Sequence, residues 1–161
     1  MSGLTWALGT FHTTVIGIAL LLLVYPGGSL GTTLGALSTI TGLALFVALW
    51  TTTLFCTGRA IRGVRLLGGD RASTGAFYRR ALRWGAVNGV LFAIALVAIL
   101  AANALAVAEP SVGIGTMLAI AGFQGTFGSL FGLAIGAVAG LVLATLDLAA
   151  LRLARSLASA G

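Results

Sequence analysis

Long runs of apolar residues, interrupted by short polar or Pro/Gly-rich segments, make up most of the chain. Four runs occur, at about 4–25, 34–57, 85–107 and 114–151. Each is long enough to supply the roughly 20 apolar residues with which a helix crosses a bilayer. We therefore predict an all-α integral membrane protein, in which four transmembrane helices pack as a bundle and form a single domain over 1–161.

The last apolar run is longer than one simple crossing requires. As a helix, 114–151 would extend about 57 Å, against a hydrocarbon core of about 30 Å. Three glycines within 122–128 make that region the least costly place for a break. The sequence predicts either a long helix that projects beyond the membrane or a helix kinked near 122–128, with the crossing at about 127–150. The segment 112–126 is then a helix extension, part of the kink or a re-entrant segment.

Basic residues gather in one place, which sets the expected orientation. All nine are arginines, and seven of them lie in 58–84, between the second and third apolar runs. Arg-rich loops stay on the cytoplasmic side, so we predict a cell-membrane protein with both termini in the cytoplasm. The spacing predicts that 58–84 is a basic cytoplasmic helical hairpin, whose second helix is capped by Ser73 or Thr74. Six of its arginines are expected to contact anionic lipid headgroups: Arg59, Arg62, Arg65, Arg79, Arg80 and Arg83.

A short motif follows each of two proline-containing turns. The pattern P-x-x-x-[LI]-G-T-x-L begins at Pro26 and again at Pro110. The second and fourth apolar runs also both end in R-x-x-R. This repetition is compatible with two tandem helical hairpins of the same orientation, and matches this short also arise by chance in sequence rich in Gly and Leu.

A regular row of small residues lies in the last apolar run. Its members recur at every fourth position and so share one helix face: Gly128, Gly132, Gly136, Gly140 and Ala144. A face without side chains lets another helix backbone approach closely, which favours helix association in membranes. We therefore expect this glycine ridge to be buried against protein. The partner is either a neighbouring helix of the same chain, or a second copy or another membrane subunit.

Each predicted span also carries polar residues in its cytoplasmic half. The candidate polar layer comprises His12, Thr51, Thr53, Asn88 and Asp147. Ionisable residues within membrane spans usually face the interior of the protein and mark functional sites. His12 and Asp147 could form a proton-sensitive pair or a small ion site. The simpler interpretation pairs Asp147 with an arginine of the basic hairpin.

Composition excludes several classes of function. The chain is 59% hydrophobic and 7% charged, too few charges for a soluble surface, so its net charge of +6 indicates lipid headgroups and not nucleic acid. One cysteine and one histidine exclude an internal disulfide, bis-histidine haem and a His- or Cys-rich metal cluster. We expect no metal, no cofactor and no enzymatic activity, because no nucleophile–base pair can be assembled.

Two functions remain. The leading interpretation is a non-catalytic membrane protein that acts by helix packing, as an accessory or scaffold subunit or as a homo-oligomer. The alternative is a small channel or transporter with an arginine-rich cytoplasmic mouth that favours anions. The distinguishing feature is whether the polar faces of the spans converge on one cavity or make separate contacts.

Overall fold

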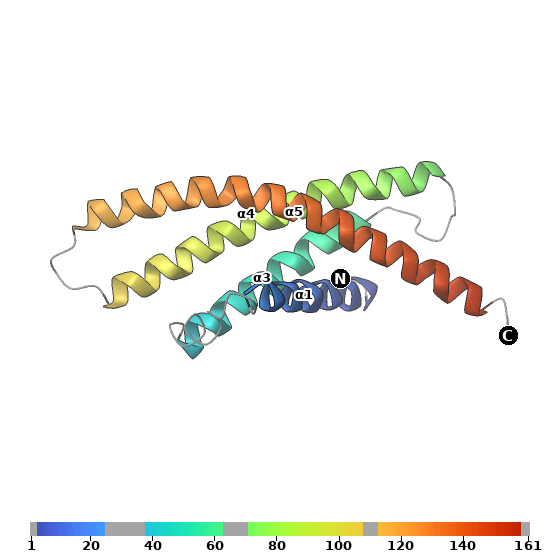
Figure 1. Cartoon of the computed structure of the whole chain (residues 1–161), viewed down its shortest axis with the longest axis horizontal. Helices are drawn as coiled ribbons and strands as arrows, with labels where there is room; N and C mark the ends of the chain where they lie inside the picture. The colour runs from blue at the N-terminus through green and yellow to red at the C-terminus, as the bar shows by residue number, and fades with distance from the viewer. Residues whose placement is uncertain (1–2, 25–37, 63–70, 108–112, 159–161) are drawn as a thin grey trace.

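A computed structural model describes residues 3–24, 38–62, 71–107 and 113–158, and every regular element in those ranges is an α-helix. The helices are shown in Figure 1 and comprise α1 (Gly3–Val24), α3 (Thr39–Ile61), α4 (Arg71–Val107) and α5 (Ile114–Ala158). Each of the four is long and apolar enough to cross a membrane. The predicted all-α class and the number of candidate spans are therefore confirmed.

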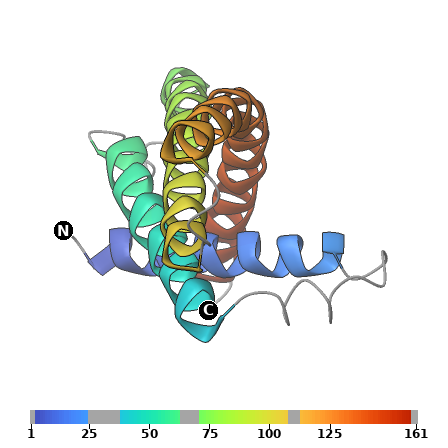
Figure 2. The same cartoon turned by 90° about the vertical axis from the view of Figure 1, so that its left-hand side faces the viewer.

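The helices pack as successive pairs. α1 packs on α3, α3 on α4, and α4 on α5. Figure 1 and Figure 2 together show α4 and α5 extending along the length of the molecule, whereas α1 runs across the other helices. A regular four-helix bundle with all spans side by side therefore stays a prediction.

The last helix is continuous past its glycines, in agreement with the first of the two predicted alternatives, a long helix. α5 has 45 residues, a length of about 67 Å, and passes through 122–128 as continuous helix. A break in an apolar environment would leave several backbone groups without partners. That loss exceeds the penalty of about 1 kcal/mol that each helical glycine carries relative to alanine. The structure contains the long helix, and 114–126 is its first part, with no re-entrant break.

The third apolar run is also part of a longer helix. α4 has 37 residues and begins at Arg71, well before the predicted span of 85–107. Ser73 and Thr74 therefore lie inside the helix, which corrects their predicted role as caps. A hydropathy pattern identifies only the part of a helix that lipid can cover. Arg, Ala and Leu favour helix both inside and outside the membrane, so α4 begins before its apolar part.

The second span is shifted toward the C-terminus relative to 34–57. Ser38 caps the start of α3, because its hydroxyl accepts a hydrogen bond from the Thr41 amide at 3.1 Å. The helix ends at Ile61, one turn later than predicted, and Arg62 follows in an extended conformation. Arg65 and the motif that begins at Pro26 lie outside the described residues, as do the first three positions, 110–112, of the second motif.

The closest approach of two helices is made by glycines near the middle of α4 and α5. Gly85 and Gly89 of α4 face Gly132, Gly136 and Gly140 of α5. A methyl group on Gly89 would lie 2.6 Å from the carbonyl carbon of Gly132 and 3.1 Å from the Cα of Gly136. No side chain fits there, and the two backbones gain van der Waals contact and weak Cα–H···O interactions.

A second close contact joins α1 to α3. A methyl group on Gly9 would lie 3.2 Å from the Cα of Leu54. Trp50 on α3 packs edge-on against Trp6, with 5.3 Å between ring centroids, and its indole nitrogen donates to the Thr10 hydroxyl at 3.4 Å. These contacts fix the side of α1 that faces the other helices.

Candidate functional site

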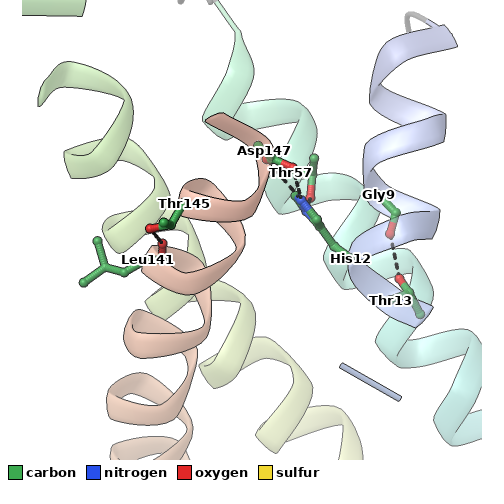
Figure 3. Close-up of polar contacts among 7 residues, drawn as sticks. All are labelled: Gly9, His12, Thr13, Thr57, Leu141, Thr145 and Asp147. Atoms are coloured by element: carbon green, nitrogen blue, oxygen red, sulfur yellow. Dashed lines mark hydrogen bonds and ion pairs between the residues drawn. The ribbon is translucent and has the colours of Figure 1, made fainter. Parts of the chain in front are cut away.

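A buried pair between the first and last helices is the centre of the candidate site. His12 Nε2 lies 3.1 Å from Asp147 Oδ1 and 3.2 Å from Oδ2. Both residues are buried: His12 is 7% exposed and Asp147 is 5% exposed. Figure 3 shows His12 reaching from α1 toward Asp147 of α5 and Thr57 of α3. Of the two partners considered for Asp147, the described residues provide the histidine.

Partners on both ring nitrogens orient the imidazole. Nδ1 of His12 lies 3.1 Å from the Thr57 hydroxyl oxygen. An ionised carboxylate only accepts hydrogen bonds, so Nε2 carries the hydrogen that faces Asp147. In a neutral ring, Nδ1 then accepts from the Thr57 hydroxyl. In a protonated ring both nitrogens carry hydrogen, and Nδ1 donates to the Thr57 hydroxyl while Nε2 forms an ion pair with Asp147.

A second polar contact links α3 to α4. The amide nitrogen of Asn88 donates to the Thr53 hydroxyl at 3.3 Å. The other amide atom, Oδ1, is buried and has no hydrogen-bond partner within the described ranges. Leaving such an acceptor unpaired costs on the order of 1–3 kcal/mol. It therefore marks a position where a hydrogen-bond donor or a cation is stabilised.

These polar groups line one cavity that residues of all four helices enclose. The cavity measures about 60 Å³. One water needs roughly 10–15 Å³ of such space, so the cavity has room for several waters or for a small ion with part of its hydration shell. Its polar lining residues are His12, Thr53, Thr57, Asn88 and Asp147, together with the thiol of Cys56.

The arginines lie outside this lining. Arg59 lies over the ring of Phe55, 5.1 Å from its centroid, in a cation–π contact. Arg80 donates to the backbone carbonyl of Arg62. Five of the arginines predicted to meet headgroups are exposed: Arg59, Arg62, Arg79, Arg80 and Arg83. None of the arginines whose side chains the structure describes lines the cavity.

Four of the five residues in the predicted polar layer line the cavity, and Thr51 does not. Thr51 is exposed and donates to backbone carbonyls of its own helix, at 2.8 Å to Val47 and 3.1 Å to Ala48. Residues that are two positions apart on a helix point in directions about 200° apart. Thr51 and Thr53 therefore lie at a similar depth but on different faces of α3. This placement corrects the inclusion of Thr51.

The predicted glycine ridge divides into two parts. Its three central glycines contact α4 within the same chain. Ala144 continues that contact in a buried apolar cluster with Phe77 and Ala81. Gly128, at the other end, has no atom within 4 Å of the position that a Cβ would take.

Several residues of the site and its support were missed in the sequence. Gly85 and Gly89 are four positions apart, the spacing recognised on the last helix, and this signal on α4 was overlooked. Thr57 follows Thr53 by four positions and therefore shares its face of α3. Spacing alone would have added Gly85, Gly89 and Thr57 to the candidate set.

The fold and the buried polar site define an all-α protein with four candidate membrane-spanning helices. The chain belongs to a family of unknown function, DUF7965, whose family model matches residues 2–161. No curated protein and no solved structure matches the chain. Its function is therefore argued from the geometry of the cavity.

Proposed function

We propose that the protein is a membrane transport protein that moves a small cation, with the cavity between its helices as the binding site. The observation that carries the proposal is that polar side chains from all four helices converge on one cavity whose acidic side chain is Asp147. A cation is favoured because the cavity is lined by a carboxylate and by no arginine of the described ranges. This proposal therefore replaces the preference for anions, which was expected from the arginines alone, with a preference for a cation.

The burial of Asp147 supports this choice. A carboxylate inside a membrane-spanning helix is costly and is generally retained where it serves a transport or proton pathway. His12 offers its two oxygens one N–H between them, which leaves lone pairs free. Together with the unpaired Oδ1 of Asn88, the cavity presents an excess of oxygen acceptors. Hard cations bind to oxygen ligands of this kind.

The arginines give the proposed orientation. In this proposal the basic ends of α3 and α4 face the cytoplasm, and both chain termini lie on that side. The exposed arginines contact anionic headgroups there. Asn88 lies on α4 five residues beyond Arg83, so the cavity falls in the cytoplasmic half of the membrane.

Cation uptake into vesicles tests the proposal. The purified full chain is reconstituted, and uptake of radiolabelled Na⁺ and Rb⁺ is measured under an inside-negative potential, with radiolabelled chloride in parallel. We expect uptake of at least one cation well above that of protein-free vesicles and no excess uptake of chloride. Cation uptake equal to that of protein-free vesicles would overturn the proposal. Chloride uptake alone would restore the anion alternative.

Helix packing is a second candidate function, and one part of α5 favours it. Gly122, Gly125 and Gly128 have open space where a Cβ would lie. Gly122 and Gly125 border a shallow groove of about 440 Å³ between α4 and α5, which is lined by small and apolar residues. A helix of a second copy or of another membrane subunit would fit closely against such a surface.

Gly125→Leu distinguishes this second candidate by the mass of the particle, because Gly125 lines the groove and has open space around it. If the groove is an interface, native mass spectrometry of the wild type gives a multiple of the chain mass, and Gly125→Leu reduces it to one chain because leucine fills the contact. Gly42→Leu is the matched control, because Gly42 on α3 also has open space around it. A wild-type particle of one chain would remove self-association from the candidate functions.

A further inference from the structure

We infer that α1 is the wall of the cavity that opens, and that the bond between His12 and Asp147 is the latch that holds α1 against α5. The inference deepens the proposed function, because it names the element that admits the cation, and it rests on that function for its role in transport. Movement of α1 is a property of the purified chain and can be measured without transport.

α1 is attached to the other helices by its first half. Its buried residues lie within 5–13, and none of residues 14–22 is buried. Of the described helices, only α3 packs extensively against α1, with Gly9 in close contact with Leu54. Figure 2 shows α1 running across the other helices. A helix held to one neighbour over half of its length can turn about that contact without disturbing the packing of α4 on α5.

His12 is the residue through which α1 reaches across the cavity to α5. Its Nε2 lies 3.1 Å from Asp147 Oδ1 and 3.2 Å from Oδ2, as drawn in Figure 3. Ile16 lies one turn further along α1 and lines the cavity from the same face of the helix. These residues of α1 close one side of the cavity, and the bond to Asp147 joins that side to α5.

The latch does not depend on the charge of the imidazole. Nε2 gives its hydrogen to an ionised Asp147 both in the neutral ring described above and in a protonated ring. Asp147→Asn keeps an oxygen that can accept the same hydrogen. The latch therefore requires a donor at position 12 and an acceptor at position 147, and it can be tested separately from the negative charge.

Opening of the latch is coupled to the entry of polar species. In a dry cavity, separation of the buried imidazole and carboxylate would leave both groups without these partners, which is unfavourable. Water, or a cation with part of its hydration shell, supplies new partners, and the cavity of about 60 Å³ has room for them. We therefore expect α1 to stay closed over a dry cavity and to move away from α5 when water and the ion enter.

Cys56 provides a native reporter of this opening. It is the single cysteine of the chain, it lines the same cavity, and it is 4% exposed. N-ethylmaleimide must reach the thiol to modify it, so the rate of modification rises when α1 moves away from the cavity.

The first experiment measures that rate in the detergent-purified full chain for two substitutions of similar size. Asp147→Leu removes the acceptor of the latch and is expected to speed the modification of Cys56 several-fold. Asp147→Asn retains an acceptor and is expected to keep the wild-type rate. Thr14→Ala is the control on α1, because Thr14 is exposed and donates to the backbone of its own helix. A wild-type rate in Asp147→Leu would overturn the inference.

A distance measurement separates movement of α1 from loss of the fold. Spin labels are attached at Ile18→Cys on α1 and Leu153→Cys on α5, two exposed positions, in a chain that also carries Cys56→Ser. By pulsed electron paramagnetic resonance we expect one distance with Asp147→Asn and a second population of distances with Asp147→Leu.

The control label pair joins Leu82→Cys on α4 to Leu153→Cys on α5, and its distance is expected to be the same in both variants. A distance between α1 and α5 that is also the same in both variants would contradict the latch. A change in the distance between α4 and α5 would show a general disruption of the helices and would equally overturn the assignment to α1.

The two proposals fail in different ways. Displacement of α1 in Asp147→Leu, together with no cation uptake by the wild-type chain, would keep the latch and remove transport. Wild-type uptake with α1 at the same distance in both variants would keep transport and remove the latch.

Discussion

Gly89→Ala is expected to destabilise the protein by about 1–3 kcal/mol or more, because the added methyl group would force α4 and α5 apart. The group would lie 2.6 Å from the carbonyl carbon of Gly132, and that atom belongs to a helix backbone that cannot turn aside. The change in unfolding free energy can be measured by titration with a denaturing detergent, followed by the fluorescence of the three tryptophans.

The matched control is Gly125→Ala on α5. A methyl group there meets no atom within 4 Å. Alanine is favoured over glycine inside a helix by roughly 0.5–1 kcal/mol, so this variant is expected to be neutral or slightly more stable. Equal destabilisation by the two substitutions would show that the contact between α4 and α5 does not decide the outcome.

Asp147→Asn is expected to reduce cation uptake to the level of protein-free vesicles. The substitution removes the one negative charge of the cavity, which is the group that attracts and balances the ion. It keeps the size of the side chain and an oxygen that still accepts from His12 Nε2, so the fold is expected to survive. Glu109→Gln, which neutralises a different carboxylate, is expected to retain uptake.

His12 acts in this scheme as a positioning residue for Asp147. His12→Gln retains an N–H donor and the charge of Asp147, so it is expected to lower uptake only partly, and less than His12→Ala, which leaves the carboxylate without this donor. Wild-type uptake by Asp147→Asn, with the variant shown to be folded by circular dichroism, would remove the carboxylate from the mechanism.

The spans could be predicted from the sequence, but the helix ends could not. Apolar runs report where lipid covers a helix, and this gave four candidate spans of the right type. The arginine-bearing start of α4 at Arg71 follows from helix propensity, to which a hydropathy pattern is insensitive. The continuity of α5 follows from the need to pair every backbone group in lipid, which outweighs its local glycines.

The contents of the candidate site could be predicted better than its arrangement. The fourfold spacing of glycines identified a packing face on α5, but spacing on one helix does not say which helix meets it. Depth in the membrane grouped His12 with Asp147, yet it also included Thr51, which points the other way. The pairing of residues 135 positions apart depends on the rotation of both helices about their axes. That rotation is set by contacts such as Gly9 against Leu54.

The position of the glycine contact has a mechanical consequence. Gly85 and Gly89 lie near the midpoint of α4, and Gly136 lies midway along α5, so the contact is a fulcrum with long arms on either side. Half of α5 is about 34 Å long, so a rotation of about 10° at the fulcrum displaces its end by about 6 Å. Asp147 lies on one arm, and the open groove with Gly125 borders the other. A partner or a change in bilayer thickness that shifts one arm of α5 therefore also moves the other arm, which carries the wall of the cavity.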